Sequence, residues 1–204
     1  LDGMEMTKAL RDNISTSHIP IILLTAKSDM DSKLQGIAEG ADDYIIKPFS
    51  ATYLQARVNN IIEIRSRLQK LYRETLMNPS SEEDQSDEKE SKMSANDRRF
   101  MDKLMELMEK NMDNGDLVVD DLVNELAVSR SVFFKKIKML TGLAPIEFIK
   151  EMRIKKAAQL IDSGEYNITQ VSYMVGINDP RYFSKCFKSR FGMTPTEYKQ
   201  KNGL

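Results

Sequence analysis

Cysteine, histidine and long apolar runs are scarce in this sequence of 204 residues. The single cysteine, Cys186, excludes an internal disulfide framework and a cysteine-rich zinc site, and one histidine, His18, leaves few metal ligands. No apolar run approaches the roughly 18–20 residues that cross a bilayer, and no signal-peptide pattern opens the chain. We therefore expect a cytoplasmic segment without membrane contact, and leave open a membrane anchor in a longer parent protein. Because the chain starts at Leu1 rather than methionine, we treat it as a fragment.

The net charge of −1 hides a strong asymmetry along the chain. Residues 129–201 contain 14 Lys and Arg against 6 Asp and Glu, a balance of +8, so the remainder carries −9. A basic segment joined to an acidic remainder is typical of a module that binds a polyanion.

The first third of the chain alternates strand-like and helical patterns. Residues 19–24 and 44–46 are short, β-branched runs, which favour strands buried on both faces. Residues 31–39 predict a helix ended by a glycine, and residues 51–72 repeat apolar positions at helical spacing. This order predicts an α/β fragment with a parallel sheet over residues 1–72.

The character of the sequence changes twice after that. Residues 73–97 are polar and acidic without an apolar period, which predicts a flexible linker. Residues 98–204 are then largely helical, which predicts an all-α domain. One face of its first helix carries Phe100, Leu104, Leu107 and Met108, and we expect these side chains to be core.

An internal repeat marks the C-terminal third. Residues 133–148 and 183–198 lie fifty positions apart and share Phe, two Lys, Gly, Pro and Glu without a gap. Each copy predicts a basic amphipathic helix, a glycine stop and a helix started by proline. A short amphipathic helix precedes each copy, over residues 119–127 and 168–175. Helix, tight turn and basic second helix together predict two helix-turn-helix units.

The residues of the second unit are specific enough to indicate a family. The segments GINDPRYFSKCFK at 176–188 and FGMTPTEY at 191–198, with Ser129-Arg130-Ser131 in the first unit, resemble the AraC/XylS family DNA-binding domain. In that family a helix joins the two units and fixes their separation, which here implies residues 145–162. The resemblance covers roughly residues 98–201 and implies double-stranded DNA as the partner.

Position by position, the resemblance implies the DNA-binding residues. Bases would be read by Ser131, Phe134 and Lys135 in the first unit, and by Pro180, Arg181, Ser184 and Lys185 in the second. The remaining DNA-binding positions are Ser129, Arg130, Lys138 and Lys188. Arg181 and Lys185 suit guanine O6 and N7 best, whereas Phe134 would contact a thymine methyl or the sugar-phosphate edge, and Pro180 would start its helix. The alternative for any single cation is a solvated helix face.

The N-terminal residues resemble the second half of a response-regulator receiver domain. The matching residues are Asp2-Gly3, Thr25-Ala26 at a strand end and Lys47-Pro48-Phe49 after the next strand. The resemblance implies that Thr25, Tyr44 and Lys47 sense a phosphoryl group, and that the Lys47–Pro48 bond is cis. The phospho-accepting aspartate and the acidic pair that binds Mg²⁺ have no counterpart here, so we expect no cofactor, metal or phosphate on this chain. With two of five strands present, we expect the half-receiver to be marginal alone.

These patterns favour a sequence-specific transcription regulator at the output end of a two-component phosphorelay. The arrangement resembles hybrid two-component sensors that control glycan-utilisation genes, which would add a homodimer in the complete protein and RNA polymerase as a further partner. The alternative is a protein-interaction module in which the half-receiver pairs with another receiver through the helix after Pro48. No Ser/His/Asp arrangement or phosphate-binding loop indicates an enzyme, and we interpret His18 as a polar loop residue.

Overall fold

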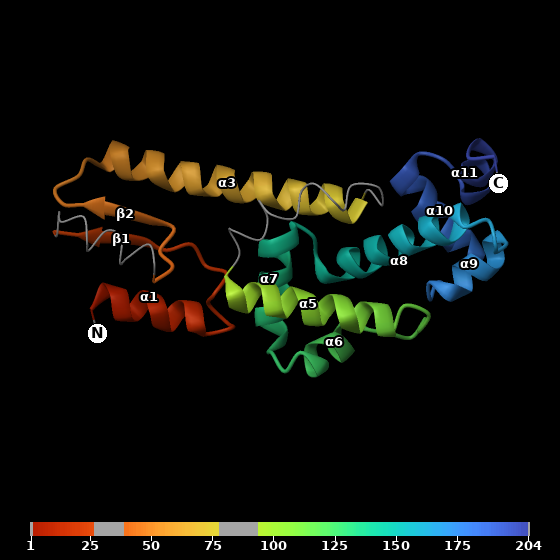
Figure 1. The fold of residues 1–204 in the computed structure, drawn as a ribbon, viewed down its shortest axis with the longest axis horizontal. Coiled ribbons are helices and arrows are strands. Elements are labelled where there is room, and N and C mark those ends of the chain that lie inside the picture. Colours follow the sequence, from red (N-terminus) through yellow and green to blue (C-terminus); the bar gives the residue numbers. More distant parts are fainter. Residues whose placement is uncertain (1, 27–38, 78–93, 204) are drawn as a thin grey trace.

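The computed structural model describes residues 2–26, 39–77 and 94–203 (Figure 1). Its N-terminal part, up to residue 77, contains α1 (Gly3–Asp12), β1 (Ile22–Thr25), β2 (Asp43–Ile46) and α3 (Ala51–Met77). Its C-terminal part contains α5 (Ala95–Lys110), α6 (Val119–Glu125), α7 (Arg130–Thr141), α8 (Pro145–Asp162), α9 (Ile168–Met174), α10 (Pro180–Phe191) and α11 (Pro195–Lys201). The described helices include none with the length and apolar character needed to cross a bilayer.

Strands β1 and β2 pair in parallel, which confirms the predicted sheet. Leu23 lies opposite Tyr44, and the backbone N–H of Lys47 donates to the carbonyl of Thr25 at 2.6 Å beyond the last pair. The expectation of strands buried on both faces is wrong at Leu24, which is 42% exposed, since alternate side chains point to opposite faces and the described elements cover this one incompletely. The helix expected over 31–39 lies almost wholly outside the described residues.

Arginine side chains hold the N-terminal part together. The guanidinium of Arg11 donates to the carbonyl of Gly40 at 2.7 Å and to the carboxylate of Asp42 at 2.5 Å. Arg65 on α3 donates to the same carboxylate at 3.2 Å and to the carbonyl of His18 at 2.6 Å. These bonds connect α1, the two strands and α3 through polar groups, which compensates for a small apolar core.

The C-terminal part has two hydrophobic cores that share helix α8. The N-terminal half of α8 contributes Phe148, Ile149 and Met152 to the first core. The C-terminal half contributes Ile154, Ala157, Ala158 and Ile161 to the second. This confirms the linking helix, which also packs the partly buried Leu160 against the second core. Phe100, Leu104, Leu107 and Met108, predicted to be core, are also buried, as are Phe133, Ile137, Phe183 and Phe187.

The repeat in the sequence is a repeat in three dimensions. Helices α7 and α10 both contain 12 residues and begin fifty positions apart. Each ends at a glycine with φ of 75°, Gly142 or Gly192, whose N–H donates to the carbonyl of Lys138 at 2.9 Å or of Lys188 at 2.8 Å. With α6 and α9 before them, they form the two predicted helix-turn-helix units, called here the first and second unit.

The two units are fastened to each other at the turn of the second unit. The buried guanidinium of Arg153 on α8 donates to the carbonyl of Gly176 at 2.9 Å and to that of Asn114, in the loop before α6, at 2.6 Å. Gly176 has φ of 67°, and a Cβ there would lie 2.8 Å from the carbonyl oxygen of Met112. The equivalent turn of the first unit has Ala127 with φ of 52°, so only the second turn is restricted by a neighbouring backbone.

Helix ends between the two parts differ from the expected boundaries. Helix α3 continues to Met77, and α5 begins at Ala95, where the Ser94 hydroxyl accepts from the backbone N–H of Asp97 at 3.1 Å. The Ser94 cap satisfies a backbone amide at the start of α5 and is a local signal for a helix start. The acidic composition of residues 73–97 obscured this signal, so the helix was expected to begin later. The central stretch of the expected linker, residues 78–93, lies outside the described residues.

Candidate nucleic-acid interface

The exposed side of α7 holds the polar residues expected in the first unit. Ser129 is the N-cap, and its hydroxyl accepts from the backbone N–H of Val132 at 3.3 Å and lies 3.2 Å from the Ser131 hydroxyl. Ser131, Lys135 and Lys138 are exposed and follow one another at helical spacing. Capping therefore occupies Ser129, while the other three side chains form one exposed row.

Arg130 and Phe134 form a stack at the start of α7. The guanidinium carbon of Arg130 lies 5.0 Å from the centroid of the Phe134 ring, and the guanidinium is paired with the carboxylate of Asp120 on α6. The half-buried Phe134 ring meets Phe133 edge-on at 6.4 Å and packs on the first core. Phe134 thus supports the cation above it as well as presenting one edge to solvent.

Helix α10 carries the corresponding row in the second unit. Pro180 occupies the first helical position and is exposed, and the Asp179 side chain caps the helix by accepting from the backbone N–H of Arg181 at 2.8 Å. Arg181, Lys185 and Lys188 are exposed at positions i, i+4 and i+7, which places them on one side of the helix. Ser184 beside them is half-buried. The second row therefore contains three cations at the positions where the first has one serine and two lysines.

Two cations counted in the basic surplus are buried and bonded within the protein, so they do not contribute to a DNA-binding surface. Lys136 is fully buried and paired with Asp97, and Arg153 is 9% exposed and bound to backbone carbonyls. Burial lowers the pKa of Arg153. The spacing could have revealed Lys136, because it follows Phe133 by three residues and precedes Ile137 on the packing side of α7.

The residues expected to sense a phosphoryl group lie near one edge of the small sheet. Thr25 ends β1 opposite Ile46, and Lys47 follows directly, so these two residues share the carboxyl edge. Thr25 is half-buried and Lys47 is exposed. Tyr44 is buried and lies opposite Leu23, two residues before the carboxyl ends of the paired strands. The Lys47–Pro48 bond is cis, as the resemblance implied.

The carboxylates near this sheet do not fit a magnesium site. Asp42 and Asp43 lie at the amino end of β2, away from Thr25 and Lys47 at the carboxyl end. Asp43 is bound by the guanidinium of Arg57, and Asp42 by those of two other arginines. Such pairing holds each carboxylate in place with cations, which is incompatible with placing it on a metal ion.

His18 lies in the loop before β1, as expected, but it is buried. It is 5% exposed, and its Nδ1 has no hydrogen-bond partner among the described residues. Burial and the positive charge of Lys136 lower the pKa of His18, with Arg65 and Lys135 acting in the same direction and Asp97 opposing them. The neutral imidazole is therefore the form that the fold favours.

This burial predicts a pH dependence of stability. The pKa of His18 in the folded chain lies below its ordinary value of 6.5, so the unfolded chain binds more protons as the pH falls through that value. The stability that neutral His18 confers is present above about pH 6.5 and is lost as the pH falls towards the folded pKa. The variant His18→Gln should lose less stability than the parent between about pH 7.5 and about pH 5.5, measured by urea unfolding at constant ionic strength. Parallel curves for the two chains would contradict this.

Family comparisons agree with the two-part architecture. Residues 1–59 match the response regulator receiver domain, and residues 122–201 match a helix-turn-helix domain. The chain joins part of a receiver domain to an AraC-type helix-turn-helix domain. This confirms the expected α/β fragment followed by a helical domain, in the order that the sequence predicted.

One relative extends the match over nearly all of the chain. The chain is 40% identical over 200 residues to histidine kinase P4 of Formosa agariphila, and the match covers 98% of this chain and 14% of the kinase. It is 48% identical over 60 residues to the phosphate regulon transcriptional regulatory protein PhoB of Pseudomonas aeruginosa, covering 29% of this chain and 26% of that regulator. The chain thus spans only a minor share of these relatives.

Solved structures resemble the C-terminal half. The C-terminal domain of AraT, a response regulator from Geobacillus stearothermophilus, has 27% identity and a TM-score of 0.47, covering 50% of this chain and 84% of that one. An AraC-type transcriptional regulator from Chromobacterium violaceum has 25% identity and a TM-score of 0.49, covering 52% and 95%.

Proposed function

We propose that the C-terminal part reads two segments of the DNA major groove as the output of a transcription regulator. The observation that carries this proposal is the pair of exposed rows, Ser131, Lys135 and Lys138 on α7 and the equivalent cations on α10. Both rows lie on the second helix of a helix-turn-helix unit, the element that contacts base edges in such motifs. Family membership supports the same class, since these domains occur in DNA-binding transcription regulators.

The two units differ in the chemistry they offer to bases. Arg181 and Lys185 can donate to guanine O6 and N7, and Ser184 lies between them. In the first unit, Arg130 is paired with Asp120 and stacked on Phe134, so its guanidinium is already engaged. We therefore assign more of the hydrogen-bonded specificity to the second unit, and more backbone and shape contact to the first.

Replacing Arg181 and Lys188 separately should distinguish base reading from phosphate contact. Arg181→Ala should cost about 1–3 kcal/mol on the preferred sequence and relax preference at one or two base pairs. Lys188→Ala should weaken binding to all sequences alike and reduce the dependence of log Kd on log salt by about 0.9. Binding is measured by fluorescence anisotropy on duplexes selected from a random pool, at several salt concentrations.

The exposed Lys156 on α8, outside both rows, provides a matched charge control as Lys156→Ala. This control should leave base preference unchanged. A uniform loss for Arg181→Ala across all sequences would show that Arg181 is not a base reader. Absence of any sequence-dependent binding by the unaltered chain would overturn the proposed function itself.

We further propose that the chain serves a hybrid two-component regulator of nutrient, specifically glycan, utilisation genes. The 40% identity with a histidine kinase over nearly the whole chain supports the hybrid architecture. In the complete protein, a phosphoryl group near Thr25 and Lys47 would favour a homodimer and contact with RNA polymerase. Sequencing genomic fragments that the chain retains is the test, and enrichment upstream of glycan-utilisation genes is the expected result.

One observation favours the alternative of an interaction module. Helix α3 exposes large apolar side chains, with Tyr53 at 50% and Ile62 at 59%. Pairing with another receiver through α3 would cover them. Analytical ultracentrifugation of the chain with Ile62→Glu should show weaker self-association than the parent if this surface is used.

A further inference from the structure

A buried polar network joins the N-terminal part to the first recognition helix. The Lys136 ammonium on α7 donates to the Ser17 hydroxyl at 2.7 Å and to the carbonyl of Ile14 at 3.0 Å, and it is paired with Asp97 on α5. The Ser17 hydroxyl donates in turn to the Asp97 carboxylate at 2.8 Å. Ser17, Asp97 and Lys136 are 2%, 4% and 0% exposed, so the three groups depend on one another for hydrogen bonding.

A second attachment lies at the last turn of the same helix. The side-chain amide of Gln69 on α3 donates to the carbonyl of Met139 at 2.6 Å and to that of Lys138 at 3.3 Å. Met139 follows Lys136 by three residues, so both attachments lie along one side of α7. The Gln69 amide provides a donor for the Met139 carbonyl near the end of α7, and a second donor for the Lys138 carbonyl, which also accepts from the N–H of Gly142.

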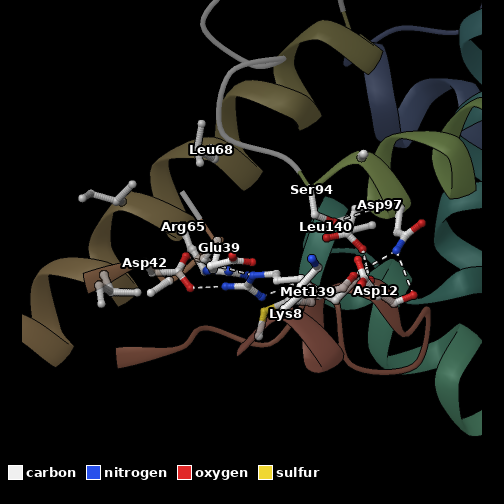
Figure 2. Close-up of a pocket in the computed structure, with 18 of the residues that line it drawn as sticks. Lys8, Asp12, Glu39, Asp42, Arg65, Leu68, Ser94, Asp97, Met139 and Leu140 are labelled. Atoms are coloured by element: carbon white, nitrogen blue, oxygen red, sulfur yellow. Dashed lines mark hydrogen bonds and ion pairs between the residues drawn. The ribbon is translucent and has the colours of Figure 1, made fainter. Parts of the chain in front are cut away.

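The setting of these contacts is a cavity between the two parts. It has a volume of about 660 Å³ and is lined from the N-terminal part by residues such as Arg65 and from the C-terminal part by Met139 and Leu140. Figure 2 shows Met139, Leu140 and Asp97 beside side chains of the N-terminal part such as Asp12. Helix α7 packs on the first core through Phe133 and Ile137, but the two parts do not pack continuously at this cavity. Here the N-terminal part is joined to α7 by a few directional polar bonds.

The second recognition helix is supported differently. Helix α10 packs on α8, α9 and α11 of the C-terminal part. The hydrogen bonds given above for Ser17 and Gln69 end on α5 and α7. The bonds of Ser17 and Gln69 therefore reach the first unit and not the second.

We propose that Ser17 and Gln69 are positioning residues for DNA recognition. They orient α7, the helix of the first unit that would enter the major groove, and so set base discrimination at the first half-site, the DNA segment that α7 would contact. This inference rests on the proposed function, because it requires that α7 meets DNA. Ser17 acts through Lys136 and Gln69 acts through the carbonyls of α7, and neither side chain belongs to the exposed rows. Ser17 and Gln69 would then transmit a phosphoryl-dependent change in the receiver to the DNA-binding surface of α7.

The test uses the full chain and three duplexes: the selected two-half-site sequence, the same sequence with the first half-site scrambled, and the same with the second scrambled. Ser17→Ala and Gln69→Ala should each weaken binding to the intact duplex by about threefold to tenfold, the effect of one hydrogen bond. On the duplex with the first half-site scrambled, both variants should bind like the parent. Circular dichroism verifies that each variant is folded, and the half-exposed Gln69 keeps the test intact should Ser17→Ala unfold.

Matched controls come from the same elements. Ser15→Ala alters an exposed serine of the same loop. Gln55→Ala alters an exposed glutamine of α3 whose side chain donates to Asn59 at 3.0 Å. Both control variants should bind all duplexes like the parent. Equal losses on all three duplexes, or no loss on the intact one by folded variants, would overturn the inference. Failure of the parent chain to prefer the selected duplex would instead overturn the proposed function.

Discussion

Replacing Gly176 with alanine should lower the free energy of unfolding of the C-terminal part by about 3–5 kcal/mol. The left-handed backbone at this position, φ of 67°, costs an alanine about 1–2 kcal/mol. The new Cβ would also lie 2.8 Å from the carbonyl oxygen of Met112 and 3.1 Å from the guanidinium of Arg153. To relieve that overlap, the turn at Gly176 must move away from the loop that contains Met112 and Asn114. The movement weakens the hydrogen bonds from Arg153 to the carbonyls of Gly176 and Asn114 and leaves a buried charge poorly paired.

Gly192→Ala provides the matched control for this effect. Gly192 has a similar φ of 75°, but a Cβ there meets nothing within 4 Å, so only the backbone cost of about 1–2 kcal/mol should appear. Ala127 shows that the fold accepts an alanine in this conformation where space allows. Urea unfolding followed by circular dichroism measures both variants. Equal losses would mean that the contact between the two units does not restrict Gly176.

Lys136→Met should destabilise the folded chain by about 3–5 kcal/mol. Methionine has a similar volume to the lysine stem, so the change chiefly removes the ammonium that faces Asp97, Ser17 and the carbonyl of Ile14. Asp97, 4% exposed, would then keep a buried carboxylate without its cation. The ammonium also lies 5.3 Å from the centroid of the Phe100 ring, a contact that methionine replaces only in part.

A double variant separates the lost pair from the lost packing. Lys136→Met with Asp97→Asn removes both charges, and its loss should be smaller than the sum of the two single losses because neither charge is then left alone. Lys135→Met, at the neighbouring exposed position, should change stability by no more than about 0.5 kcal/mol. Strictly additive single losses, or a similar loss at both lysines, would show that the buried network is not a stabilising unit.

Local patterns were sufficient to predict the helical domain. The repeat located α7 and α10 through residues that are neighbours in the chain: a basic amphipathic run, Gly142 or Gly192 at its end and a proline after it. The linking helix was predicted over the bounds Pro145–Asp162 that the structure shows. Capping, periodicity and chain breaks act within a few residues, and sequence reasoning can therefore find them.

The contacts between distant segments were not predictable in the same way. The spacing can place Lys136 on the packing side of α7, but it cannot identify the partners, a carboxylate 39 residues away and a serine 119 residues away. Arg153 likewise resembles a surface charge in the sequence, because the carbonyls of Asn114 and Gly176 that it binds belong to distant segments of the chain. Even the buried position of His18 depends on α3 and α7 covering its loop. The partners of these buried groups come from tertiary packing, which composition and spacing do not encode.

The single continuous helix α8 also limits how this protein can evolve. Because its two halves belong to different cores, one residue inserted near Met152 would turn the second unit relative to the first by about 100° and move it by about 1.5 Å. The bond network around Arg153 would break at the same time. Substitutions on α7 and α10 leave that geometry intact. New operator sequences are thus accessible by exchanging side chains, whereas a new distance between the half-sites requires rebuilding the middle of the domain.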